Sequence, residues 1–236
     1  MARLARPEQA SSNPAMYFLE WKSDEKCFSY YDKTKGEKGD NVKINRPIKL
    51  LFLEHYHGVK GWNDADHSGI WSNEVFLISK EELTVKTKTR TIAKGLYKDI
   101  KENVKNAGAS YLRIVYCMTE KGEIIRIGLK GASVGGIKKE KAVDGKDHKG
   151  YSDFYNDTNH LLDNQWFIWN GCHEAKSGKV QYSIPNFEMG DTITDAENDM
   201  ANICVDKLQK YIDSRNEPKK DAKEIEVIDD EEVHDI

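Results

Sequence analysis

The stretch from Ser110 to Lys130, SYLRIVYCMTEKGEIIRIGLK, carries the clearest strand-pairing signal in the chain. Two runs rich in β-branched and aromatic residues flank a short polar join that contains Gly122, which is typical of a β-hairpin. Side chains alternate between the two faces of a strand. Alternation therefore predicts that Leu112, Ile114 and Tyr116 oppose Tyr111, Arg113 and Val115, and that Ile125, Ile127 and Leu129 oppose Arg126, Gly128 and Lys130.

The segment before this hairpin predicts three strands and a helix. Short apolar or alternating runs indicate strands at residues 48–53, 70–79 and 83–90. Between residues 92 and 107 apolar residues recur every four positions, and Gly108 follows as a helix stop. We expect an amphipathic helix of about four turns there.

Aromatic runs at residues 17–21 and 27–31 predict a further hairpin near the N-terminus. After the central hairpin, residues 132–164 are expected to form a long loop. Strands are expected at residues 165–169 and 179–184, and an apolar stripe at helical spacing predicts a helix from Thr194 to Asp213.

This order predicts a mainly β, or α+β, fold. Three strands, a helix and two strands is the connectivity of an OB-fold, a five-stranded barrel that holds single strands or oligosaccharides across one face. We therefore expect an OB-fold-like barrel with an added hairpin and a C-terminal helix. The expected domain spans residues 16–214, with the long loop 132–164 inside it.

Two segments are expected to lie outside this domain. Residues 1–15 have the composition of a disordered basic arm. Residues 215–236 are expected to form a disordered acidic tail, because residues 224–236 hold seven carboxylates and no lysine or arginine. Residues 221–236 contain eight of the 40 acidic and one of the 36 basic groups, so residues 1–220 carry a net charge of about +3. A mildly basic body with an acidic tail points toward nucleic acid as a partner.

Cations and exposed aromatic rings on the predicted strands are the candidate binding residues. Lysines and arginines follow the phosphates of a single strand, while aromatic rings stack on its bases. The predicted DNA-binding residues are Trp62, Trp71, Lys86, Lys88, Arg90, Tyr111, Arg113, Arg126 and Lys130. A solvated strand face with core tryptophans is the alternative for any one of them.

The whole arrangement resembles the single-stranded DNA-binding proteins of bacteria and of phage or mobile-element replication systems. The resemblance rests on the acidic end 224–236, and on Gly61-Trp62, Ser72-Asn73-Glu74 and Leu129-Lys-Gly-Ala-Ser133 within residues 48–133. The chain lacks the Pro-Phe stretch with which the bacterial members usually end. The resemblance implies a non-enzymatic role without a cofactor, in which the protein binds and protects single-stranded DNA during replication or recombination.

The tail is expected to act in two ways. A tethered run of carboxylates competes for a basic groove when DNA is absent, and it is free for partner proteins when DNA is bound. The resemblance implies replication or recombination proteins as those partners, with a homo-oligomer left open. The residues predicted to bind partners are Asp229, Asp230, Glu231, Glu232, Asp235 and Ile236.

A metal-dependent nuclease or hydrolase is the main alternative. His55 and His57 would share one strand face, and Asp64, Asp66 and His67 follow within ten residues. Imidazoles with a carboxylate can hold zinc or manganese, and the metal then activates water. This spacing matches no established ligand pattern. A protein-interaction module with a basic face is the third class.

Cysteine spacing and hydropathy bound the remaining classes. The four cysteines, at positions 27, 117, 172 and 204, show no C-x-x-C spacing and are expected to be reduced. No apolar stretch reaches the length needed to cross a bilayer, and the start of the chain lacks the apolar middle of a signal peptide. We expect a cytoplasmic protein, in the bacterial host cell if a phage encodes it.

Overall fold

The protein is built around one large mixed β-sheet, described by a computed structural model for residues 12–216. The predicted N-terminal arm lies mostly outside these residues, and the predicted tail lies outside them from residue 217 onward. The strands are β1 (Tyr17–Lys22), β2 (Cys27–Asp32), β3 (Asp40–Lys43), β4 (Ile48–Asn63), β5 (Ser68–Ser72), β6 (Leu83–Lys86), β7 (Thr91–Gly95), β8 (Ala109–Thr119), β9 (Ile124–Leu129), β10 (Gln165–Ser177) and β11 (Val180–Thr192). The helices are α1 (Tyr97–Asn106), α2 (Ala132–Gly135), α3 (Tyr151–Leu162) and α4 (Asp195–Asn216).

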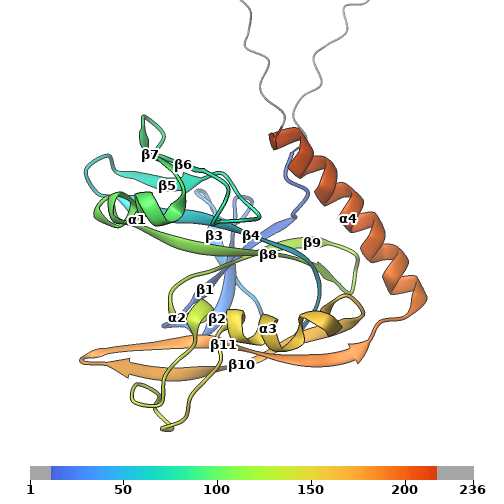
Figure 1. Cartoon of the computed structure of the whole chain (residues 1–236). Helices are drawn as coiled ribbons and strands as arrows, with labels where there is room; N and C mark the ends of the chain where they lie inside the picture. The colour runs from blue at the N-terminus through green and yellow to red at the C-terminus, as the bar shows by residue number, and fades with distance from the viewer. Residues whose placement is uncertain (1–11, 217–236) are drawn as a thin grey trace, which may run out of the picture.

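The hairpin of β8 and β9 forms as its sequence predicts. It lies near the middle of this sheet. The strand order is β3-β2-β1-β9-β8-β4-β5-β6-β7, and the hairpin of β10 and β11 joins the first half of β4. β1 runs parallel to β9, whereas the other paired strands are antiparallel. Strands distant in sequence therefore lie side by side, and β4 links them because it pairs with β5, β8 and β10 (Figure 1).

The sheet is not a closed barrel, so the expected five-stranded OB barrel is not confirmed. β9 pairs with the N-terminal strand β1 and not with the strands that follow β5. The turn between β1 and β2 approaches β11 without forming a ladder. The amide nitrogen of Ser183 donates to Ser23 Oγ at 2.6 Å, and Trp21 Nε1 donates to the Ser183 carbonyl at 2.8 Å.

Helices cover both faces of the sheet (Figure 1). On one face, which we call the core face, α3 buries Tyr151, Phe154 and Leu162 against β4, β8 and β9. α1 buries Ile100 and Val104 farther along the same face. On the opposite face α4 packs against the β4, β8 and β9 end of the sheet through four buried residues, namely Ala201, Cys204, Leu208 and Tyr211. Each fully buried large apolar side chain contributes about 1.5–3 kcal/mol to stability.

Four sequence expectations about the elements are wrong. The expected strand 70–79 ends at Ser72. The helix begins at Tyr97 and not at residue 92, because Thr91–Gly95 forms β7, and Gly95 turns the chain with a φ of 146° that favours glycine. The expected strand 83–90 ends at Lys86, where Thr87 and Arg90 close a turn. The expected loop 132–164 contains α2 and α3.

Other expectations are confirmed. The N-terminal hairpin is β1 and β2, the C-terminal helix is α4, and Gly108 ends α1 with a positive φ. All four cysteines are free, and Cys117 and Cys204 are buried. Among the helices of residues 12–216, none combines the length and the apolar character that a membrane span requires.

Candidate nucleic-acid interface

The face of the sheet opposite the core face is open at one end, and we call this open part the groove face. Strand pairing defines its members, because directly paired residues point to the same side. Phe18 pairs with Arg126, Glu20 with Gly128, and Lys60 with Trp71. The side chains that register places on this face are Phe18, Glu20 and Lys22 of β1, Ser29 and Tyr31 of β2, Lys60 and Trp62 of β4, Trp71 of β5, Lys86 of β6, Leu112 of β8 and Arg126 of β9.

Three adjoining hollows follow this face. The largest has a volume of about 580 Å³ and lies over β1 and β2, and the others have volumes of about 340 and 180 Å³. Lys60 lines the first and third hollows, Glu20 the first and second, and Leu112 the second and third. Each pair of hollows thus shares a lining residue, and we call the three adjoining hollows together the depression, which extends across β2, β1, β9, β8, β4 and β5.

Aromatic rings stand exposed along the depression and beside it. Phe18 is 46% exposed, Tyr31 54%, Trp62 54% and Trp71 41%. Large rings with this much exposure are unusual for side chains that serve only packing, whereas Trp166 and Trp169 are buried in the core. A Cβ at Gly69, which pairs with Trp62, would meet no atom within 4 Å, so the surface beside this ring is open.

Lysines concentrate positive charge at the middle of the depression. Lys60 Nζ contacts the Glu20 carboxylate, and Lys130 Nζ donates to the Lys60 carbonyl at 3.1 Å. Burial lowers the pKa of Lys60 to about 8, and the charges of Lys130 and Arg126 add to this lowering. Burial, followed by the charge of Lys22, also lowers the pKa of Lys130. These cations repel one another, so an anion that binds among them relieves the repulsion.

Arg126 is held by a carboxylate and not free for a ligand. Its Nε and Nη2 atoms lie 3.0 and 2.9 Å from Glu74 Oε1, and the two side chains are only 15% and 8% exposed. The Tyr116 hydroxyl donates to the other Glu74 oxygen at 2.8 Å. The Arg126 guanidinium also lies 5.6 Å from the centre of the Phe18 ring, so it orients this exposed ring.

Five of the nine predicted DNA-binding residues lie at the groove face. Trp62, Trp71, Lys86 and Arg126 project from it, and Lys130 follows β9 and lines the second hollow. Strand pairing brings Trp71 directly opposite both Lys60 and Lys86. Trp71 thus lies between two lysines on neighbouring strands.

Lys88 and Arg90 lie elsewhere than expected. They belong to the turn between β6 and β7, so they do not continue a strand face that starts at Lys86. Arg90 Nε lies 3.1 Å from Asp66 Oδ2, which neutralises its charge. Lys88 is exposed on this turn.

Tyr111 and Arg113 lie on the core face, opposite to Arg126. Arg113 pairs with Leu129 and His57, and both neighbours point to the core side. Arg113 and Arg126, both predicted to bind DNA, therefore do not share one face of the sheet. The two runs of the hairpin each alternate as predicted, but sequence alone does not show which side of one run joins which side of the other.

The histidine and aspartate residues of the metal alternative do not converge. His55 and His57 do share the core face, with ring centres 6.0 Å apart. Asp66 instead pairs with Arg90, and His67 lies in the turn between β4 and β5. Among residues 12–216 no group of three or more His, Cys, Asp or Glu side chains is placed to hold a metal ion.

Sequence reasoning missed four groove-face residues, namely Phe18, Lys22, Tyr31 and Lys60. The alternation in the segment YFLEWK of β1 separates Phe18, Glu20 and Lys22 from the buried Leu19. That signal was present, but the parallel pairing of β1 with β9 has no local signature.

Comparison of the chain with protein-family models, curated proteins and solved structures gives no significant match.

Proposed function

We propose that the protein binds single-stranded DNA across the groove face, with little sequence specificity and without catalysing a reaction. The observation that carries the proposal is the depression, where exposed rings of β1, β2 and β5 lie beside lysines of β1 and β4 and beside Lys130. Lysines neutralise phosphates, and each base that stacks on a ring contributes about 1–3 kcal/mol. Because every base has a π-face, such binding tolerates any sequence.

The element order matches that of an OB-fold in part. β4, β5, β6 and β7 precede α1 and the hairpin of β8 and β9 follows it, so one strand more than the three of an OB-fold comes before the helix. In this proposal the hairpin of β1 and β2 takes the place beside β9 that a closing strand occupies in a complete barrel. The added hairpin then extends the binding surface with Phe18, Lys22 and Tyr31.

The acidic tail is proposed to compete with DNA for the groove face and to recruit replication or recombination proteins when displaced. α4 ends beside the groove face, since Ile212 and Arg215 line a small hollow together with Asn73 and Glu74. Glu74 in turn holds Arg126. The carboxylates at positions 221–236 therefore follow in sequence from a point next to the cationic depression, and attraction between opposite charges favours their contact.

A gel shift with single-stranded and double-stranded oligonucleotides of equal length, at two salt concentrations, tests the DNA-binding proposal. We expect preferential binding of the single strand, weakened steeply by salt because counterions are released on binding. Quenching of tryptophan fluorescence by oligo-dT provides a second measurement, since Trp62 and Trp71 are exposed. Absence of both signals would instead favour an acidic protein as the partner of this face.

Deletion of residues 221–236 tests the role of the tail. Competition predicts tighter binding of single-stranded DNA by the shortened chain, with the largest gain at low salt, where charge attraction is least screened. A matched variant replaces the seven carboxylates of residues 224–236 by their amides, so that length is kept and charge is removed. If affinity is unchanged or falls in both variants, the tail does not compete for the groove.

A further inference from the structure

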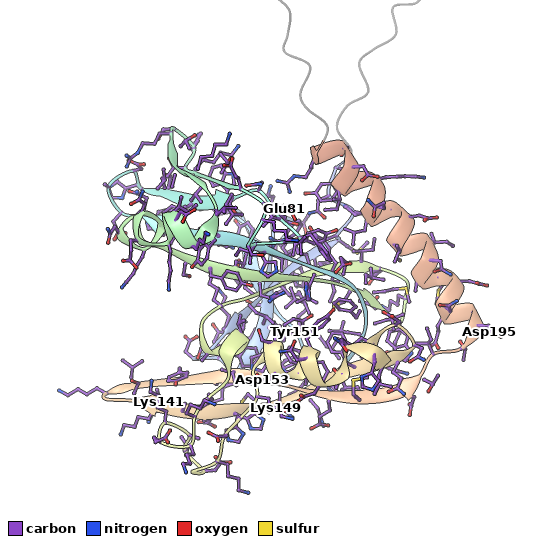
Figure 2. All side chains as sticks on the ribbon, viewed as in Figure 1. Glu81, Lys141, Lys149, Tyr151, Asp153 and Asp195 are labelled. Atoms are coloured by element: carbon purple, nitrogen blue, oxygen red, sulfur yellow. The ribbon has the colours of Figure 1, made fainter. Side chains whose placement is uncertain are left out.

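The core face holds a second group of polar side chains that DNA binding on the groove face does not use. We call it the core-face cluster. It lies where β4 and β8 pass between α1 and α3, and Figure 2 shows Tyr151 on the side of α3 that faces these strands. Its members are His55, His57, Tyr97, Tyr111, Arg113, Tyr151 and Tyr155.

Buried polar atoms without a partner gather in this cluster. Within residues 12–216, six buried side-chain nitrogen or oxygen atoms form no hydrogen bond, and three of them are His55 Nδ1, Arg113 Nε and the Tyr151 hydroxyl. Tyr151 is only 2% exposed. An unpaired buried polar atom costs about 1–3 kcal/mol, so three of them in one place indicate that another group completes their hydrogen bonds.

The cluster has a cation without a counter-ion. Among the described residues no carboxylate forms an ion pair with Arg113, in contrast to Arg126 and Arg90. The charge of Arg113 acts on His55, His57, Tyr111, Tyr151 and Tyr155, which places it among them. Glu54 influences Tyr151 and Tyr155 through its field only, and its Oε1 atom accepts a bond from the His55 amide at 2.7 Å.

The two histidines are neutral near pH 7, so each ring has one donor nitrogen and one acceptor nitrogen. Burial, followed by the charge of Arg113, lowers the pKa values of both His55 and His57 to about 4. Arg113 Nη1 lies 3.4 Å from His57 Nε2, so this nitrogen accepts and the proton resides on Nδ1. His57 Nδ1 then donates to the Tyr111 oxygen at 2.7 Å, and the Tyr111 hydroxyl proton remains available.

We propose that the core-face cluster binds a small oxyanion, either inorganic phosphate or the terminal phosphate of a polynucleotide, between Arg113, Tyr151 and His55. Arginine and tyrosine hydroxyls offer donors and a positive charge, whereas a phosphate oxygen only accepts, so the two sets are complementary. A metal cation fits poorly because Arg113 repels it. His55, His57 and Tyr155 are half-buried, so the cluster reaches the surface.

Thermal unfolding of the full chain in phosphate tests this proposal. Sodium phosphate is compared with sodium chloride of equal ionic strength at pH 7.5. We expect the melting temperature to rise by roughly 2–4 °C once phosphate exceeds its dissociation constant about fivefold. The key variant is Tyr151→Phe, which removes a hydroxyl that has no partner in the protein and keeps the ring, so the variant is expected to fold.

Tyr56→Phe is the matched control. Tyr56 lies on the same strand as His55 and is also buried, but it points to the opposite face. We expect Tyr56→Phe to keep the phosphate-dependent rise and Tyr151→Phe to lose at least half of it. An equal rise in chloride, or an equal rise in Tyr151→Phe and the wild type, would overturn the proposal, because solvent water then satisfies these atoms.

A second measurement distinguishes the two sources of phosphate. Single-stranded oligonucleotides that carry a 5′-phosphate, a 3′-phosphate or only hydroxyl ends are compared for affinity. If the strand end is the ligand, one phosphorylated oligonucleotide binds more tightly, and Tyr151→Phe removes the difference. If inorganic phosphate is the ligand, the three bind alike while the melting effect persists. The melting measurement does not involve the groove face, so failure of the DNA-binding proposal leaves it intact. The comparison of oligonucleotides rests on the proposed function, because strands with only hydroxyl ends bind through the groove face.

Discussion

Arg113 and Arg126 lie on adjacent strands of one hairpin but project to opposite faces of the sheet. Their guanidinium groups therefore have different partners. Arg126 projects to the groove face, where the buried Glu74 holds it at 2.9 Å. Arg113 projects to the core face, where it meets neutral imidazoles and tyrosines and no carboxylate within residues 12–216. A cation in a strand therefore does not by itself mark a nucleic-acid contact, because its partner decides what it does.

The same contrast extends to the surroundings of the two arginines. Around Arg126 the lysines Lys22 and Lys130 line the depression and form no ion pair within residues 12–216. Lys60 instead contacts Glu20, and exposed rings accompany these lysines. Around Arg113 the rings are close to one another, with His55 and Tyr155 centres 4.5 Å apart, and three buried polar atoms have no hydrogen-bond partner within residues 12–216. The groove face suits an extended polyanion, and the core face suits at most a small one.

The largest expected effect comes from removing Arg126. Arg126→Met leaves the Glu74 carboxylate, 8% exposed, without its counter-ion, and we expect a loss of about 3–5 kcal/mol in the free energy of unfolding. Arg113→Met removes a cation that has no ion-pair partner, so the expected loss is below about 1 kcal/mol in buffer without phosphate. Urea unfolding of both variants measures the difference.

The contrast between the two arginines requires that Arg126→Met loses clearly more free energy of unfolding than Arg113→Met. Glu74→Gln is a further variant for the paired site, and it should also destabilise because Arg126 and Tyr116 both lose a charged partner. Similar losses for Arg113→Met and Arg126→Met would mean that Arg113 has a stabilising partner equivalent to Glu74.

The next effect concerns the lysines of the groove face. The triple variant Lys22→Gln, Lys60→Gln and Lys130→Gln should lower the affinity for single strands of every sequence. The slope of log affinity against log salt should become shallower by about 2, since each phosphate contact contributes roughly 0.7. Fluorescence anisotropy of a labelled oligonucleotide at four salt concentrations gives this slope.

A matched triple variant removes the same charge from α1. Lys98, Lys101 and Lys105 are exposed on this helix, which packs on the core face. Their replacement by glutamine should leave the salt slope nearly unchanged. If both triple variants reduce the slope equally, net charge and not the groove determines binding.

The exposed rings are expected to contribute next. Trp71→Ala should weaken binding by about 1–3 kcal/mol, because Trp71 lines the depression between Lys60 and Lys86. Trp62→Ala should have a smaller effect, since Trp62 lies at the end of β4 beside the depression. Anisotropy titrations measure both, and Phe76→Ala is the control because Phe76 is 47% exposed but lies in the loop after β5. If only Phe76→Ala loses affinity for the oligonucleotide, the binding surface lies beside Phe76 and not on the groove face.

The local pattern of the sequence predicts much of this arrangement. Strong alternation and turn residues identify the β8 and β9 hairpin, and the apolar stripe identifies α4. Trp62, Trp71 and Lys86 meet at the groove face because β4, β5 and β6 follow one another in the chain and pair as neighbours. Pairing between strands that are consecutive in the chain can be predicted from sequence, because the short connection between them limits the possible register.

Pairing between strands that are far apart in the chain cannot be predicted from the local sequence pattern in this way. Phe18 and Lys22 reach the groove face only because β1 pairs with β9, more than 100 residues later. The segment of α3, YSDFYNDTNHLL, contains many polar residues and shows no clear apolar stripe in sequence, yet the helix buries Tyr151, Phe154 and Leu162. The opposite orientation of Arg113 and Arg126 likewise depends on the register of two strands, which a single run of alternating residues does not contain.

The smallest expected effect concerns acid stability and returns to the core face. His55 and His57 have pKa values of about 4 in the folded chain, below their ordinary value of 6.5, chiefly because of burial and then because of Arg113. The unfolded chain therefore binds more protons between pH 6.5 and 4, and folding stability falls as the pH is lowered through this window. With these pKa values the loss at pH 5 relative to pH 7.5 is at most about 2 kcal/mol for each histidine, and because both rings are partly exposed we expect a value on the order of 1 kcal/mol. Urea unfolding at both pH values measures it.

Replacement of these histidines should remove that part of the pH dependence. His55→Gln and His57→Gln keep a polar side chain without a group that titrates in this window, so the double variant should show a smaller loss between pH 7.5 and 5 than the wild type. His160→Gln is the control, because His160 is exposed on α3 and away from Arg113. If the double variant and the wild type lose the same stability, protonation of the core-face histidines does not oppose folding. A group other than these two histidines would then balance the unpaired charge of Arg113.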